Sequence, residues 1–155
     1  MALKTVKYAA VGLLSGIFIF DRIGYPAVVR GSSMEPTLVG ISRRDGRYTV
    51  KDVVWINRLK KNSEKLDIIA LISPKDRNST FIKRVSGTEG ERVRFPKIND
   101  GRHFLIPEHH LCVMSDNINK NVGIDSSNFG PVSKSLVIGK ATHIIWPPSR
   151  WRKLT

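Results

Sequence analysis

A serine and a lysine that lie fifty residues apart are the side chains of this sequence that could together hydrolyse a peptide bond. Ser33 sits in the turn-like run 31–38 (GSSMEPTL), and Lys83 sits in the apolar run 81–85 (FIKRV). A serine hydroxyl becomes an effective nucleophile when a neighbouring base takes its proton. Lysine can be that base only in its neutral form, which an apolar pocket favours over the ammonium form. The two segments therefore predict a Ser/Lys hydrolase.

Neither segment is specific alone, but a third segment follows them. Gly-Ser-Ser is common in turns, and a Lys-Arg pair usually lies on a solvated strand face. Asp116-Asn117 and Asp125-Ser126 come next, before Phe129-Gly130-Pro131-Val132. The ordered motifs Ser-Met-x-Pro, Lys-Arg-Val leading into Gly and Glu, and Asp-Asn…Asp-Ser resemble the signal peptidase I family over about residues 26–148. This resemblance implies a membrane-bound serine endopeptidase that uses a Ser/Lys dyad.

A narrower resemblance is to the mitochondrial branch of this family. It rests on the runs 73–75 (SPK), 125–133 (DSSNFGPVS) and 141–151 (ATHIIWPPSRW), and on the compact length, because bacterial relatives usually carry a longer inserted second domain. It implies an enzyme of the mitochondrial inner membrane whose catalytic domain faces the intermembrane space. The implied substrates are presequence-bearing precursor proteins. The implied partner is the other catalytic subunit of the same protease, in a heterodimer.

The resemblance assigns roles to residues of the first two motifs. Ser33 matches the nucleophile, because it directly precedes the Met-x-Pro, and Lys83 matches the general base. The backbone N–H of Ser33 is the expected first oxyanion donor, while Gly31 stands where bacterial relatives carry a serine hydroxyl as a second donor. Met34 and Pro36 are expected to shape the turn and the substrate groove, in which the substrate lies extended between two strands. Neither step of this chemistry requires a cofactor or a metal.

Three further residues are expected to support the site. Arg84 follows Lys83 on the same strand and so points to the opposite face, and Arg84→Lys is expected to retain most activity. Asp125 is interpreted as a structural carboxylate for the active-site loops, with an Asx-type turn residue as an equal alternative, and Ser126 completes the Asp-Ser motif. Bacterial relatives carry, two residues before that aspartate, a serine that helps orient the lysine. Gly123 occupies this position, so the resemblance leaves the orienting role vacant.

The composition favours a basic protein at a membrane surface. The 155 residues suit one domain, and 26 Lys and Arg against 13 Asp and Glu give a net charge of +13. Such a charge also fits nucleic acid. The basic residues, however, are spread from Lys4 to Lys153 and form no aromatic-basic binding module, so nucleic acid is not an expected partner.

The single cysteine, Cys112, excludes an intrachain disulfide and is interpreted as a buried small side chain. His109 and His110 could pair with it in a cysteine hydrolase, but nothing in the sequence fixes that geometry. Adjacent histidines cannot both face one side of a strand. No ligand spacing indicates a metal site.

Residues 1–29 are expected to hold the chain on a membrane. A basic start precedes the uncharged run 9–20 (AAVGLLSGIFIF), which is shorter than the ~20 residues that a spanning helix normally needs. Extending the segment over 6–29 would reach across a bilayer but would include the charged pair Asp21-Arg22. A cleaved targeting segment, a buried core helix and a helix lying in the interface remain open alternatives. The family resemblance favours an uncleaved anchor helix.

Residues 30–155 are expected to form a catalytic domain of short antiparallel strands. Runs rich in β-branched and aromatic residues recur at short spacing, and turn signals such as Asp45-Gly46 and Asp100-Gly101 separate them. The fold class is therefore mainly β, and the resemblance refines it to coiled antiparallel β-sheets of the signal peptidase type. The expected strands are 48–56, 67–72, 80–85, 92–95, 104–106, 111–114 and 136–146.

Two other functions remain open at the level of sequence. A bacterial-type signal peptidase I would act at a plasma membrane, but Ser127 stands where bacterial members have an arginine, and the body is short. A non-catalytic, membrane-bound scaffold subunit would keep the fold without the chemistry, which the intact Ser33 and Lys83 argue against. The leading hypothesis is a membrane-anchored serine endopeptidase that removes sorting peptides from proteins delivered to the mitochondrial intermembrane space.

Overall fold

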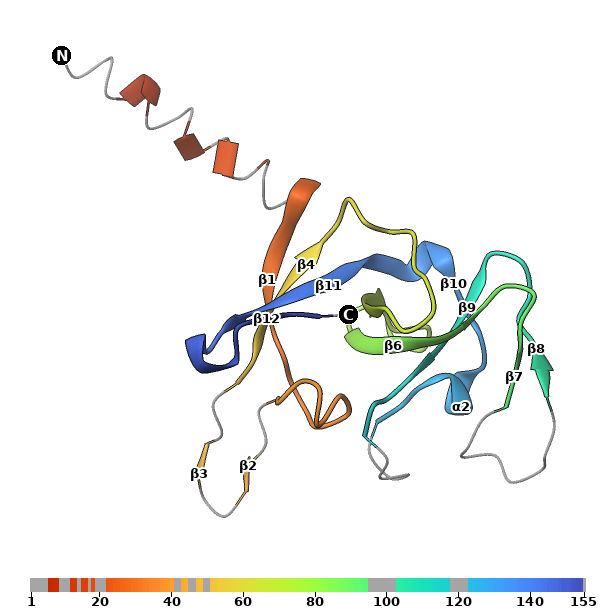
Figure 1. Cartoon of the computed structure of the whole chain (residues 1–155). Helices are drawn as coiled ribbons and strands as arrows, with labels where there is room; N and C mark the ends of the chain where they lie inside the picture. The colour runs from red at the N-terminus through yellow and green to blue at the C-terminus, as the bar shows by residue number, and fades with distance from the viewer. Residues whose placement is uncertain are drawn as a thin grey trace.

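The architecture is a curled antiparallel sheet, seen in a computed structural model of the chain (Figure 1). The structure describes residues 6–8, 12–13, 15–16, 18, 22–40, 43–44, 47–48, 51–94, 103–117 and 123–154. Within these residues the main sheet has eight strands in the order β1-β4-β11-β5-β6-β9-β10, with β12 paired to β11. The bounds are β1 Gly24–Val28, β4 Val53–Asn57, β5 Ile68–Ile72, β6 Thr80–Thr88, β9 His110–Met114, β10 Val132–Ser133, β11 Val137–Trp146 and β12 Arg152–Lys153. The predicted mainly β class is confirmed.

Several smaller elements accompany this sheet. Two short antiparallel ribbons pair β2 with β3 and β7 with β8. Their bounds are β2 Arg43–Arg44, β3 Arg47–Tyr48, β7 Arg92–Val93 and β8 Phe104–Leu105. The short α-helix α2 spans Ser126–Phe129, and the 3-10 turns η2 and η3 span Lys134–Leu136 and Pro148–Arg150.

Most strands lie where the sequence predicts them. The expected runs 67–72, 80–85, 111–114 and 136–146 correspond to β5, β6, β9 and β11. The strand expected over 48–56 instead begins its sheet pairing at Val53. The Asp52 carboxylate before it is occupied by the N–H of Val39 and the guanidinium of Arg150. β10 and β12 are two-residue strands that no pattern predicted, because so short a run carries no detectable alternation.

The structure corrects one boundary of the sequence-based interpretation. Gly24–Val28, inside the 1–29 segment expected to form a membrane helix, is the edge strand β1, paired with β4. Pro26 lacks an N–H, which an edge strand tolerates and a helix interior does not. Gly24 permits the close approach of β4, because a Cβ there would lie 2.3 Å from the carbonyl oxygen of Ile56. The β body therefore begins at Gly24.

The N-terminal residues 6–18 are helical where the structure describes them, at 6–8, 12–13, 15–16 and 18. Four of them expose apolar side chains, namely Val6, Tyr8, Leu13 and Phe18. Among the described residues, no helix is long and apolar enough to cross a membrane. The membrane anchor therefore stays a prediction.

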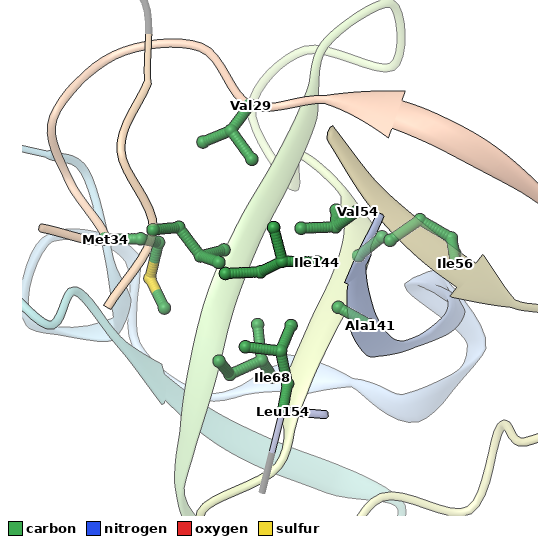
Figure 2. Close-up of a cluster of buried hydrophobic side chains, with 10 residues drawn as sticks. Val29, Met34, Val54, Ile56, Ile68, Ala141, Ile144 and Leu154 are labelled. Atoms are coloured by element: carbon green, nitrogen blue, oxygen red, sulfur yellow. The ribbon is translucent and has the colours of Figure 1, made fainter. Parts of the chain in front are cut away.

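Strand β5 is buried on both faces, and its side chains belong alternately to two hydrophobic clusters. Ile68 and Ala70 pack into one cluster, and Ile69 and Leu71 pack into the other. A strand covered on both faces is expected to form a continuous apolar run, as β5 does. The first cluster, shown in Figure 2, also contains Met34, so the segment that follows β1 is anchored in the core.

Candidate active site

Ser33 lies in a turn that the core holds in place. The turn comprises residues 31–38, and its Met34 and Leu38 side chains are buried in the first cluster. Leu38 N–H donates to Met34 O at 2.8 Å and closes the turn. Gly31 opens it with φ +73°, a left-handed conformation that glycine adopts without steric cost. Ser33 is thereby fixed, half-buried, at the surface of the sheet.

Lys83 lies on the buried side of β6. The residue is 3% exposed, and its Nζ lies 5.9 Å from the centre of the Phe81 ring. Nζ donates a hydrogen bond to Ser115 Oγ at 3.0 Å. Removal of water by burial disfavours the ammonium form and so favours the neutral amine.

Gly123 marks the point at which these side chains meet. A Cβ placed on Gly123 would lie 2.8 Å from Ser33 Cβ, 3.1 Å from Lys83 Nζ and 2.7 Å from Ser115 Oγ. The three side chains therefore surround one small space beside the Gly123 backbone. The structure thus brings Ser33 and Lys83, predicted as a pair, to one place.

Ser33 and Lys83 also line one cleft, of about 480 Å³. One wall is formed by β1 and the residues after it, and the other by the first half of β6. Apolar lining comes from Ala27 and Val29 on the first side and from Ile82 on the second. Because β1 is an edge strand, a peptide in this cleft could lie extended beside it.

The residues expected to shape the groove divide into two groups. Met34 lines the cleft as well as the core. Gly31 and Pro36 are not among the lining residues of the cleft, and both belong to the surrounding turn. Pro36 is exposed and follows a cis peptide bond from Glu35.

Asn117 ties the loop after β9 to the turn that carries Ser33. Its backbone N–H donates to Ser33 O at 3.0 Å, and its Nδ2 donates to Ser32 O at 2.8 Å. The Asp-Asn motif singled out this residue in the sequence, but no pattern indicated what it contacts. Asn117 thereby fixes the backbone carbonyl groups of both serines.

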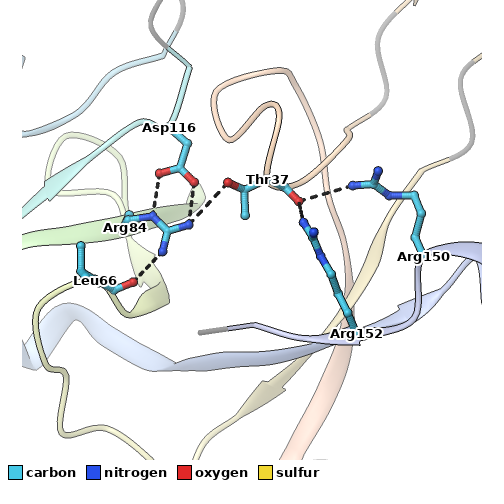
Figure 3. A network of polar contacts seen from close by, with 6 residues as sticks. All are labelled: Thr37, Leu66, Arg84, Asp116, Arg150 and Arg152. Carbon is cyan, nitrogen blue, oxygen red and sulfur yellow. Dashed lines mark hydrogen bonds and ion pairs between the residues drawn. The ribbon is translucent and has the colours of Figure 1, made fainter.

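Arg84 binds the same loop through Asp116 (Figure 3). Its Nε and Nη2 donate to the two carboxylate oxygens, each at 2.8 Å, and Nη1 donates to Leu66 O at 2.7 Å. The hydrogen bond with Asp116 raises the pKa of Arg84 above its ordinary value. Lysine cannot reproduce this planar fork. The geometry therefore speaks against the expectation that Arg84→Lys retains most activity.

Asp125 and Ser126 support the segment that carries Ser115, and each is 1% exposed. The Asp125 carboxylate accepts from Ser127 N–H at 3.0 Å, where it caps α2, and from Ser115 N–H at 3.3 Å. Ser126 Oγ accepts from Val113 N–H of β9 at 2.9 Å. The two interpretations of Asp125, as a structural carboxylate and as a turn residue, thus describe one arrangement.

Two arginines of the C-terminal segment bind the turn of Ser33 as well. Arg150 of η3 and Arg152 of β12 donate to the Thr37 carbonyl oxygen at 3.4 and 2.8 Å (Figure 3). Arg150 also forms an ion pair with the fully buried Asp52 at 2.8 Å. No sequence pattern pointed to these contacts, because Thr37 lies 113 and 115 residues away from the two arginines.

The alternative nucleophile, Cys112, has the wrong environment for catalysis. It is fully buried, and burial raises the pKa of its thiol to about 11. The thiol is therefore protonated near neutral pH, which argues against a cysteine hydrolase. Among the residues that the structure describes, no group of three His, Cys, Asp or Glu side chains could hold a metal ion.

Comparisons with known proteins agree with the motifs. The family described as signal peptidase, peptidase S26, matches residues 2–101, a span that includes Ser33 and Lys83. The chain is 38% identical to mitochondrial inner membrane protease subunit 2 of Danio rerio over 141 residues, which cover 89% of this chain and 73% of the relative. Subunit 2 of Saccharomyces cerevisiae is 35% identical over 141 residues, covering 86% and 74%. Mitochondrial inner membrane protease subunit 1 of Homo sapiens is 27% identical over 150 residues, covering 94% and 81%.

Proposed function

Because the chain belongs to the signal peptidase family, peptidase S26, we propose that it cleaves peptide bonds with Ser33 as the nucleophile and Lys83 as the general base. The observation that supports this pair most directly is their meeting beside Gly123. Lys83 is 3% exposed there. Such burial favours the neutral amine, which is the form that can act as a base. The cleft that both residues line leaves room for a substrate on the open side of the pair.

The mechanism is a two-step acyl transfer. Lys83 Nζ accepts the Ser33 hydroxyl proton while Oγ attacks the substrate carbonyl carbon, and the protonated Nζ then gives that proton to the leaving amine. In the second step a water gives a proton to Nζ and attacks the ester carbon, and the protonated Nζ then gives that proton to Ser33 Oγ as the acyl group leaves. This restores the serine hydroxyl and the neutral lysine. The backbone N–H of Ser33 donates to the oxyanion in both steps.

The residues around the pair keep its geometry. Asn117 holds the backbone of Ser32 and Ser33, and Arg84 holds the loop of Asn117 through Asp116. A misplacement of about 1 Å in such a site costs on the order of 100-fold in rate. These residues act through the position of Ser33 and have no contact with the reacting atoms in this mechanism.

The substrates of this site are precursor proteins that carry a sorting presequence. Relatives named mitochondrial inner membrane protease subunits support a location at the mitochondrial inner membrane, with the β body facing the intermembrane space. Two relatives named subunit 2 are 38% and 35% identical to the chain, whereas relatives named subunit 1a and subunit 1 are 33% identical in Arabidopsis thaliana and 27% identical in Homo sapiens. This difference favours the subunit 2 role in a heterodimer with the other catalytic subunit. Residues before Gly24 serve as the membrane anchor.

The test is cleavage of a presequence-bearing precursor by the full-length chain, expressed with its partner subunit. Ser33→Ala is expected to lose activity by several orders of magnitude, as removal of a nucleophile does. Ser32→Ala is the matched control, because the neighbouring hydroxyl has no role in the mechanism, and it is expected to stay within tenfold of the unmodified protein. A dead Ser32→Ala beside an active Ser33→Ala would shift the nucleophile by one residue. Full activity of both variants would remove the serine mechanism.

A further inference from the structure

Ser115 is in direct contact with Lys83, and the proposed mechanism does not use it. Lys83 Nζ donates to its Oγ at 3.0 Å. The serine follows the last residue of β9, so its backbone continues a strand paired with β6, the strand of the lysine. Its own N–H donates to the buried carboxylate of Asp125. The backbone of Ser115 is therefore held in place beside Lys83.

Gly123 supplies the space that Ser115 occupies. A Cβ at position 123 would lie 2.7 Å from Ser115 Oγ and 2.8 Å from Ser33 Cβ, closer than such atoms approach in real side chains. Gly123 also has φ +90°, which strains any residue with a Cβ. No side chain at 123 can therefore share the space with Ser115 and Ser33. The hydroxyl beside the lysine therefore comes from Ser115, which follows β9, and not from a side chain at position 123.

We propose that Ser115 is the positioning residue of Lys83, an inference that rests on the proposed Ser/Lys function. A neutral lysine amine has one lone pair and two N–H groups. When one N–H is bound to Ser115 Oγ, rotation about the last side-chain bond is restricted, and the lone pair is directed toward Ser33. The arrangement fills the orienting role that Gly123 leaves vacant in the sequence pattern.

The hydrogen bond also has a predictable effect on protonation. An acceptor oxygen stabilises the ammonium form of a lysine more than its neutral form. Removing Ser115 Oγ should therefore make deprotonation of Lys83 easier while leaving the amine poorly oriented. The two effects act in opposite directions, since more of the base is neutral but each neutral amine transfers protons less often.

The experiment measures kcat, KM and the pH profile of kcat/KM for the full-length chain with its partner subunit. Ser115→Ala is expected to lower kcat by about 10- to 100-fold, to leave KM within about twofold, and to move the acid limb of the profile to lower pH. Ser115→Thr keeps the hydroxyl and is expected to exceed Ser115→Ala by about tenfold in kcat. The thermal unfolding midpoint of each variant is measured to establish that it is folded.

Ser86→Ala is the matched control. Ser86 is also half-buried, lies on β6 with Lys83, and donates its Oγ–H to the carbonyl of Cys112 at 3.2 Å. It is expected to keep kcat and the acid limb unchanged. A folded Ser115→Ala with unchanged kcat, an equal loss in Ser86→Ala, an unmoved acid limb, or a folded Ser115→Thr no better than Ser115→Ala would each overturn the positioning role.

The outcomes separate this inference from the proposed function. If the unmodified chain does not cleave the precursor, or if Ser33→Ala is as active as the unmodified chain, then the Ser/Lys function itself fails. If Ser33→Ala is inactive but Ser115→Ala is fully active, the function stands and the positioning role alone is wrong.

Discussion

Lys83 is the side chain on which the mechanism depends most, because its chemistry requires an uncommon protonation state. The residue is 3% exposed, and an ordinary lysine is protonated near neutral pH. Lys83→Arg is expected to be inactive, because a guanidinium stays protonated and cannot act as a base. Lys83→Met is expected to be inactive but at least as stable as the unmodified protein, since it fills the same space without a buried amine. Turnover of a precursor and thermal unfolding measure the two properties.

The pH dependence gives a second check on the same residue. Only the neutral amine accepts a proton, so kcat/KM is expected to rise with pH along a limb that belongs to Lys83. His110 is half-buried at the start of β9, and His110→Gln serves as the control, with an unchanged limb expected. Substantial turnover by Lys83→Arg, or a limb that disappears in His110→Gln, would show that the lysine is not the base.

Ser33 and Lys83 could be proposed as a pair from the sequence because their motifs are local and contiguous, and the structure brings the two residues together. The contact between Ser115 and Lys83 was not predictable, because it depends on the pairing of β6 with β9 and on the missing side chain at Gly123. The fork between Arg84 and Asp116 was missed for the same reason, since strand alternation tells which face a residue takes and not what it meets there.

At the scale of elements, the turn of Ser33 is held by contacts from β6, η3 and β12. Arg84 of β6 donates to the Thr37 hydroxyl at 3.5 Å, and Arg150 and Arg152 donate to the Thr37 carbonyl. Each of these arginines belongs to a different element, and Figure 3 shows their guanidinium groups converging on Thr37. The turn is therefore tied to both the middle and the end of the chain.

Asp52 is the buried acid of this network and gives a test at the element scale. Its carboxylate accepts from Val39 N–H at 2.8 Å and from Arg150 at 2.8 and 3.0 Å. Asp52→Ala leaves these donors without their partner and is expected to lower the free energy of unfolding by about 2 kcal/mol. It is also expected to slow cleavage, because Arg150 is shared with Thr37. Urea denaturation measures the first effect and precursor turnover the second.

The control for Asp52 is an ion pair of similar length at the surface. Lys65 Nζ lies 2.9 Å from the Glu91 carboxylate, with both side chains exposed. Lys65→Met is expected to change the free energy of unfolding by less than about 0.5 kcal/mol. An equal effect of the two substitutions would mean that Asp52 contributes no more than a surface charge.

The element boundaries show where sequence patterns stop being informative. Long strands such as β6 and β11 carry enough alternation of apolar and polar residues to be predicted. The edge strand β1, in contrast, was predicted to be part of the apolar helix that precedes it. Pro26 and Gly24 were the available signals that a helix would end before Val28. The partner that makes β1 a strand, β4, lies about thirty residues further along the chain.

At the scale of the whole molecule, the N-terminal segment is joined directly to the substrate cleft. β1 begins at Gly24, and its residues Tyr25, Ala27 and Val28 line the cleft. Arg58 N–H donates to Ile23 O at 2.9 Å, so the start of β1 is held to the loop after β4. If the residues before Gly24 lie in a membrane, the cleft is held close to its surface. A net charge of +13 favours approach to anionic lipid.

Membrane attachment and folding are therefore expected to separate at Gly24. The full-length chain should stay with membranes through alkaline carbonate extraction, whereas a chain without residues 1–22 should be released. That shorter chain keeps β1 and should unfold cooperatively.

Removal of residues 1–29 also deletes β1 and Val29, a residue of the first core cluster. It should lower the thermal unfolding midpoint by many degrees or prevent folding. Quantitative release of the full-length chain by carbonate would rule out an integral anchor, and equal midpoints for the two truncated chains would show that β1 contributes nothing to the body.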